Sequence, residues 1–94
     1  MATETVSAPS PLVLVVDDDP LVQGAAELAL QAAGFQVAQA LNGSAAIQTF
    51  ATTKPDLVLL DVLMPGMDGY ATCAALRRLT SGQHTPIVFL TGCD

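Results

Sequence analysis

Two apolar runs of this sequence end in carboxylates. Residues 12–16, Leu-Val-Leu-Val-Val, are followed by Asp17 and Asp18, and residues 57–60, Leu-Val-Leu-Leu, are followed by Asp61. Continuous apolar runs of this length predict strands that are buried on both faces. Each carboxylate is therefore expected where a buried strand emerges from the core.

A hydroxyl has the matching place after a later run, because residues 86–90 are followed by Thr91. Residues 35–40 alternate apolar and polar side chains, which is typical of an edge strand with one partly exposed face. Helical patterns separate these runs, and strands that alternate with helices through short loops predict an α/β domain with a parallel sheet. The carboxyl ends of parallel strands share one edge of the sheet, where ligands bind.

The three carboxylates are expected to converge if the first and third strands are neighbours. Their ends would then lie about 5 Å apart. Like charges at that distance raise each other's pKa, and a cation is needed to keep them ionised. Carboxylates without His or Cys favour Mg²⁺, which also accepts water and phosphate oxygens as ligands. The alternatives are a solvated acidic rim for Asp17, Asp18 and Asp61, and an ordinary strand-end residue for Thr91.

The first predicted helix covers residues 21–33. Asp19 and Pro20 suit its N-cap and first position, and Gly34 suits the C′ position. Its inner face is expected to hold apolar residues at steps of three and four: Leu21, Val22, Ala25, Leu28, Ala29 and Ala32. The other side is expected to hold the polar residues: Gln23, Glu27 and Gln31.

Two further helices are predicted at about residues 44–53 and 69–79, the second with Asp68 as its N-cap. The inner face of the earlier one is expected to hold Ala46, Ile47 and Phe50. The inner face of the later one is expected to hold Tyr70, Cys73, Ala74 and Leu76.

Composition limits the class of protein. A chain of 94 residues with 51% hydrophobic and 4% aromatic residues forms one domain with an aliphatic core. Its net charge of −6 argues against nucleic acid or an anionic membrane surface as a direct partner. Residues 1–11 are expected to be a disordered leader rather than a signal peptide, and residues 12–94 the folded domain. No apolar run reaches the roughly 20 residues of a membrane span, and we expect a cytoplasmic protein.

Three segments together resemble the receiver domain of two-component response regulators. They are residues 16–20, Val-Asp-Asp-Asp-Pro; residues 60–69, Leu-Asp-Val-Leu-Met-Pro-Gly-Met-Asp-Gly; and residues 89–92, Phe-Leu-Thr-Gly. The acid pair, the lone acid and the strand-end threonine occur in the family's order and on the expected elements. The resemblance implies a flavodoxin-like, doubly wound parallel sheet with strand order 2-1-3-4.

The resemblance also implies roles for individual residues. Asp61 would accept a phosphoryl group from a sensor histidine kinase or a phosphotransfer protein. Asp17, Asp18, Asp61 and the Leu63 backbone carbonyl would hold Mg²⁺, or Mn²⁺ as a second candidate. Thr91 would contact a phosphoryl oxygen and shift on phosphorylation. Such a domain is not an enzyme beyond transfer to its own aspartate and its own dephosphorylation.

The sequence departs from the family at its C-terminal side. Receivers of this kind continue with a helix, a fifth strand that carries a Lys, and a final helix. Lys54 cannot replace that Lys, because it lies at the amino-end side of the sheet. We expect the residues to be a fragment of a longer regulator with a C-terminal effector domain; a natural short form completed by homodimerisation is the alternative.

Three other functions are alternatives to the receiver. A haloacid-dehalogenase-like phosphatase needs a second Asp two residues after its nucleophile, where this sequence has Leu63. A flavodoxin-like electron carrier needs a phosphate-binding loop after the first strand, where this sequence has three acids. A receiver-shaped interaction or dimerisation module that does not cycle phosphate is the third alternative.

Overall fold

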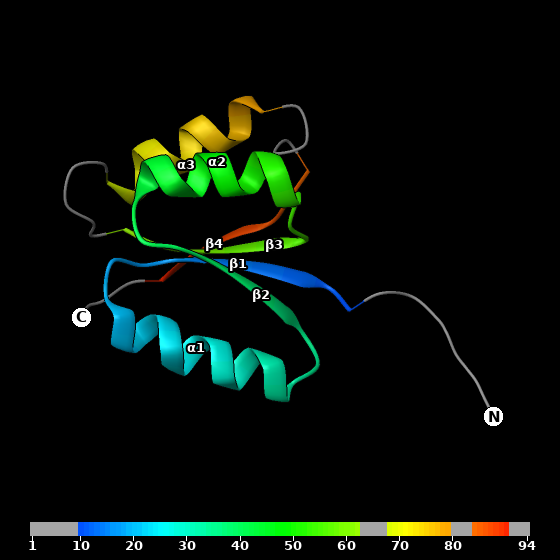
Figure 1. Ribbon diagram of the computed structural model, residues 1–94. Coiled ribbons are helices and arrows are strands. Elements are labelled where there is room, and N and C mark those ends of the chain that lie inside the picture. The colour runs from blue at the N-terminus through cyan, green and yellow to red at the C-terminus, as the bar shows by residue number, and fades with distance from the viewer. Residues whose placement is uncertain (1–9, 63–67, 80–83, 91–94) are drawn as a thin grey trace.

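Apolar runs form β1, β4 and most of β3, an alternating segment forms β2, and the segments between the strands form the helices (Figure 1). The computed structural model describes residues 10–62, 68–79 and 84–90. Its strands are β1 (Leu12–Val16), β2 (Gln36–Ala40), β3 (Leu57–Asp61) and β4 (Ile87–Leu90). Its helices are α1 (Pro20–Ala32), α2 (Gly43–Thr53) and α3 (Gly69–Arg78). Among these helices none has the length and apolar character required to cross a membrane.

The four strands form one parallel sheet in the order β2-β1-β3-β4. Val16 of β1 pairs with Leu60 of β3, so these two strands end side by side. Helix α1 lies on one face of the sheet, and α2 and α3 lie together on the other (Figure 1). The predicted α/β class, the order 2-1-3-4 and the edge position of β2 are confirmed.

The main core lies between the sheet and the α2–α3 layer. Alternate residues of the two central strands point into it, as the two-residue period of a strand requires. Its fully buried large side chains are Leu14, Val16, Phe50, Val58, Leu60 and Leu76. The intervening residues Val13 and Val15 are also buried, on the face that α1 covers.

Side-chain caps begin each helix, as predicted for α1 and α3. A carboxylate oxygen of Asp19 accepts from Leu21 N at 2.9 Å, and one of Asp68 accepts from Ala71 N at 2.7 Å. Each bond satisfies a backbone N–H that the first turn of a helix leaves without a partner. Gly34 follows α1 with φ +97°, which confirms the predicted left-handed stop.

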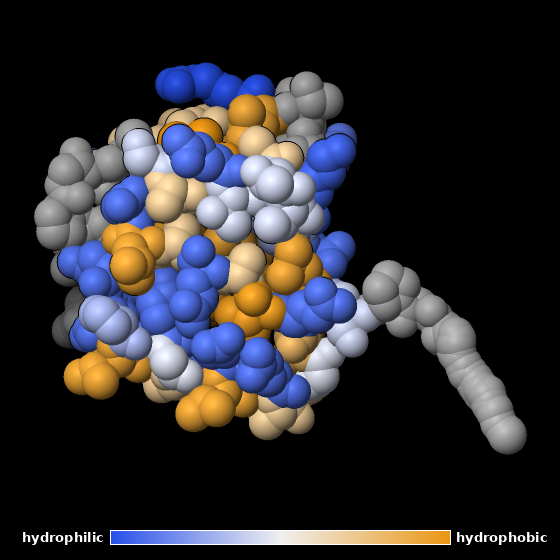
Figure 2. Space-filling view, in the orientation of Figure 1, coloured by the Kyte–Doolittle hydropathy of each residue, from blue (hydrophilic) through white to orange (hydrophobic). Residues whose placement is uncertain are grey.

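The predicted inner face of α1 is wrong. The side chains of Leu21 and Leu28 are 83% and 73% exposed, whereas Gln23 is the residue of α1 that is buried, at 2% exposure. Orange apolar side chains are correspondingly visible at the lower surface of the molecule, where α1 lies (Figure 2). The physical reason is a hydrogen-bonding requirement, because the Gln23 amide donates to backbone carbonyls near the ends of β1 and β2. That requirement overrides the apolar period.

The predicted inner face of α3 is partly wrong. Leu76 is fully buried, but Tyr70 and Ala74 are exposed, and Thr72 takes the buried position. The Thr72 hydroxyl donates to the Asp68 carbonyl at 3.0 Å, so the polar group is satisfied within its own helix. The predicted inner face of α2 is confirmed, with Ala46 and Phe50 fully buried and Ile47 packed against the core.

Candidate functional site

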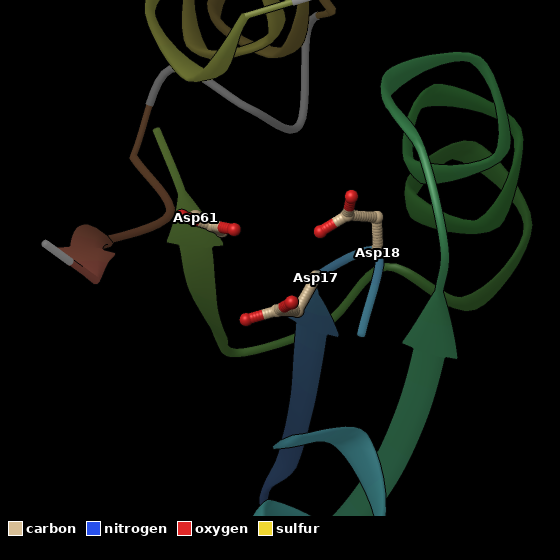
Figure 3. Close-up of side chains that lie close together, drawn as sticks. All are labelled: Asp17, Asp18 and Asp61. Atoms are coloured by element: carbon tan, nitrogen blue, oxygen red, sulfur yellow. The ribbon is translucent and has the colours of Figure 1, made fainter. Parts of the chain in front are cut away.

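Three carboxylates meet between the ends of β1 and β3. Asp17 and Asp18 directly follow β1, and Asp61 is the last residue of β3. One carboxylate oxygen from each lies within 4.8 Å of the others, and the side chains gather in one small space (Figure 3). The convergence expected from strands one and three is therefore present. Because the strands are parallel neighbours, it follows directly from the sheet order.

The three carboxylates differ in their surroundings. Asp17 is buried, Asp61 is half-buried and Asp18 is exposed. Burial raises the pKa of the Asp17 carboxyl, and the nearby negative charges of Asp61 and Asp18 raise it further. A hydrogen bond from Asp19 N to Asp17 Oδ1, at 2.9 Å, opposes this rise in pKa. The site thus holds negative charge that a cation would stabilise.

The donor set fits a hard divalent cation. All three groups offer carboxylate oxygens, which Mg²⁺ and Mn²⁺ prefer. One oxygen from each side chain lies within 4.8 Å of the others, so the three carboxylates are close enough together to share one ion. Asp17, Asp18 and Asp61 are thus the residues that could hold such an ion.

The two sides of the site are fixed by local structure. On the β1 side, Asp19 caps α1 and Pro20 occupies its first position, so the chain turns directly from strand to helix. On the β3 side, Gly69 N donates to Val62 O at 3.1 Å, and α3 begins there. A Cβ added to Gly69 would meet the Val62 backbone and would lie 2.6 Å from the Asp61 carbonyl oxygen. Glycine therefore permits α3 to start against the end of β3.

Two other predicted site residues, Leu63 and Thr91, lie outside the described residues. Among the described basic residues, Lys54 caps the C-terminus of α2 shortly before β3 begins, at the edge of the sheet away from Asp61. Arg77 donates to the Thr85 carbonyl, beyond the last turn of α3.

Sequence reasoning missed Gln23 and the packing role of Gly69. Gln23 was placed on the solvent side of α1 because it breaks the apolar period. The only sign of its buried position in the sequence is that it comes six residues after Asp17. One turn of helix can bring a side chain at that position back to the end of β1. For Gly69, the signal was its position directly after the Asp68 cap, where a helix starts next to a strand end.

The chain was compared with known proteins. A family model of the response regulator receiver domain matches residues 13–94. PilG of Pseudomonas aeruginosa is 34% identical over 82 residues, which cover 87% of this chain and 61% of PilG. The chain thus spans less than two thirds of that relative's length.

Solved structures agree. The chemotaxis protein CheY4 of Vibrio cholerae has a TM-score of 0.87 and 32% identity, covering 90% of this chain and 71% of that one. TrrA of Thermotoga maritima, solved in complex with Mg²⁺–BeF, has a TM-score of 0.82 and 32% identity, covering 89% of this chain and 71% of that one.

These matches confirm the resemblance drawn from the three sequence segments. Receiver domains are signalling modules rather than enzymes in the usual sense; they interact with histidine kinases and are often joined to effector domains. The family match covers nearly every described residue, and the fold and sheet order agree with it. This chain therefore belongs to the response regulator receiver domain family of two-component signalling.

Proposed function

We propose that this chain accepts a phosphoryl group on Asp61 with the help of Mg²⁺ and passes the signal on as a change of conformation. The observation that carries the proposal is the convergence of Asp17, Asp18 and Asp61 within 4.8 Å at the carboxyl edge of the sheet. The partner is a histidine kinase or a phosphotransfer protein that carries a phosphohistidine.

The transfer is a direct displacement at phosphorus. A carboxylate oxygen of Asp61 attacks, a P–O bond forms and the P–N bond to the partner's imidazole breaks. The electron pair of the broken bond stays on the imidazole nitrogen. Asp61 then carries an acyl phosphate, and attack by water on its phosphorus returns the carboxylate and inorganic phosphate.

The remaining residues have supporting roles in this proposal. Asp17 and Asp18, together with Asp61, would hold Mg²⁺, with Mn²⁺ as a substitute. The ion supplies positive charge that offsets the charge on the phosphoryl oxygens. The Leu63 carbonyl is assigned as a further ligand and Thr91 as the phosphoryl contact that shifts.

We place the function in the folded unit of residues 12–94, with residues 1–11 as a leader outside it. The protein works in the cytoplasm, and an effector domain in the parent regulator receives the conformational change.

The proposal is tested by labelling with radioactive acetyl phosphate in the presence of Mg²⁺. Wild type should gain a base-labile label, as an acyl phosphate requires. Asp61→Asn should gain none, because an amide oxygen is a far weaker nucleophile than a carboxylate. Asp56→Asn is the matched control, since it makes the same change just before β3, at the opposite edge of the sheet.

Amide NMR shifts during Mg²⁺ titration give the second measurement. Residues around the three carboxylates should shift, and Gly34 at the far end of α1 should not. Labelling that persists in Asp61→Asn would refute the phosphoacceptor role. Mg²⁺ binding without any labelling of wild type would instead favour a receiver-shaped module that does not cycle phosphate.

A further inference from the structure

The two N–H groups of the buried Gln23 amide are shared among three backbone carbonyl oxygens. Its Nε2 lies 3.0 Å from the Val15 carbonyl oxygen in β1 and 3.0 Å from the Asp17 carbonyl oxygen. It also lies 2.8 Å from the carbonyl oxygen of Ala40, the last residue of β2. One side chain from α1 thus ties the ends of two neighbouring strands to the turn that carries the acid pair.

These bonds fix the Asp17 backbone from both sides. The Asp17 N–H donates to the Ala40 carbonyl at 3.1 Å, and the Asp17 carbonyl accepts from Gln23. The Asp17 side chain is also held, because its Oδ1 accepts from the Asp19 N–H at 2.9 Å. The direction of the Asp17 carboxylate therefore depends on a network in which Gln23 is the donor that comes from outside the turn.

The other half of the Gln23 amide is unsatisfied. Its Oε1 is buried and, within the described residues, has no hydrogen-bond partner. Burying a polar oxygen without a partner opposes folding. An apolar side chain of similar length would avoid that penalty but would leave the three carbonyls without this donor. The environment thus uses the N–H groups of Gln23 and makes no use of its oxygen.

We propose that Gln23 is a positioning residue for the metal centre: it sets the geometry of the Asp17–Asp18 turn without contacting the ion. The part that concerns the ion rests on the proposed function. Residues that orient metal ligands typically change metal affinity by about 10–100-fold when they are replaced. We expect an effect in this range here.

The test compares Gln23→Met with Gln31→Met. Both remove a glutamine amide from α1 and keep an unbranched chain, but Gln31 is exposed and bonds to Glu27 within its own helix. Mg²⁺ affinity is measured on folded protein by NMR titration. Gln23→Met should bind Mg²⁺ at least about tenfold more weakly than wild type, and Gln31→Met should bind it as wild type does.

Amide hydrogen exchange without metal supplies a readout that does not depend on ion binding. In Gln23→Met, exchange should accelerate at Asp17 and Asp19 and stay unchanged at Val58, whose N–H donates to Pro86 O in the core of the sheet. Gln23→Lys restores donors and has no acceptor, so protection at Asp17 and Asp19 should return. Because the positive charge of lysine also affects ion binding, Gln23→Lys is compared by hydrogen exchange alone. The same variant is used in place of Gln23→Met if that protein does not fold.

Several results would overturn the proposal. They are an unchanged Mg²⁺ affinity in folded Gln23→Met, an equal rise of exchange at Val58, or a Lys variant without protection at Asp17. If wild type itself does not bind Mg²⁺, the proposed function fails, and the exchange data alone decide whether Gln23 fixes the turn.

Discussion

Replacing Gly69 with alanine should displace the end of β3 and the carboxylate of Asp61. A Cβ at this position would lie 2.6 Å from the Asp61 carbonyl oxygen and would also meet the Val62 backbone. Non-bonded carbon–oxygen contacts in proteins lie at about 3.3 Å or more. The backbone must therefore move by about 0.7 Å to relieve the contact with the oxygen and farther to clear the Val62 backbone, because no flexible side chain is there to yield.

The displacement has consequences for stability and for chemistry. Overpacking of this kind costs about 1–3 kcal/mol in the free energy of unfolding, and each kcal/mol lowers the melting temperature of a small domain by about 4–8 °C. A misplacement of about 1 Å can slow a positioned reaction about a hundredfold. For a shift of about 0.7 Å we expect labelling by acetyl phosphate to slow at least about tenfold.

Gly24→Ala is the matched control. It makes the same change inside α1, where nothing lies within 4 Å of the added Cβ. Removing a glycine from a helix interior should raise stability by about 0.5–1 kcal/mol and leave the labelling rate unchanged. Urea unfolding and labelling are measured on all three proteins. A Gly69→Ala variant that keeps wild-type stability and rate would refute the steric reasoning.

Two further predictions concern charge and the sheet edge. The native structure raises the pKa of Asp17 above its ordinary 3.8. Native protein therefore binds the Asp17 proton more tightly than unfolded protein does, and metal-free protein loses stability as the pH rises above 3.8. Asp17→Asn should remove this loss of stability, so that the metal-free variant is more stable than wild type at pH 7. Urea unfolding between pH 3 and 7 measures this, and a variant less stable than wild type at pH 7 would contradict it. Among the described residues β4 pairs only with β3, and Val88 is 48% exposed, so we expect self-association through this edge. Val88→Lys should shift sedimentation towards monomer, and a wild type that stays monomeric at high concentration would contradict it.

The sheet and the acid cluster could be predicted because their signals are local. The strands that carry the carboxylates begin as short apolar runs, and Asp17, Asp18 and Asp61 come within two residues of the ends of those runs. The parallel arrangement then requires the ends of neighbouring strands to meet at one edge. Helix starts at Asp19 and Asp68 were predictable for the same reason, since a cap and the N–H groups that it satisfies are two or three residues apart.

The orientation of α1 could not be predicted from its own period. Its apolar residues occur on both sides of the helix: Leu21 and Leu28 are exposed, whereas Ala26 and Leu30 are half-buried on the side of Gln23. What turns Gln23 inward is a set of carbonyls on β1, on the following turn and on β2. Ala40, which supplies one of them, is distant from Gln23 in the sequence, and its place becomes known only when the sheet is assembled. Tyr70, which was predicted to be buried, packs its ring on Phe89 of β4 with centroids 5.0 Å apart and nevertheless stays 65% exposed.

The two sides of the site are held by different physical means. On the β1 side, hydrogen bonds from Gln23 and Asp19 hold Asp17, and such bonds can lengthen or break one at a time. On the β3 side, the backbone of Asp61 and Val62 lies so close to Gly69 that an added Cβ would not fit. We therefore expect loss of a hydrogen bond to loosen the acid pair, and an added methyl group at Gly69 to displace Asp61, the proposed phosphoacceptor.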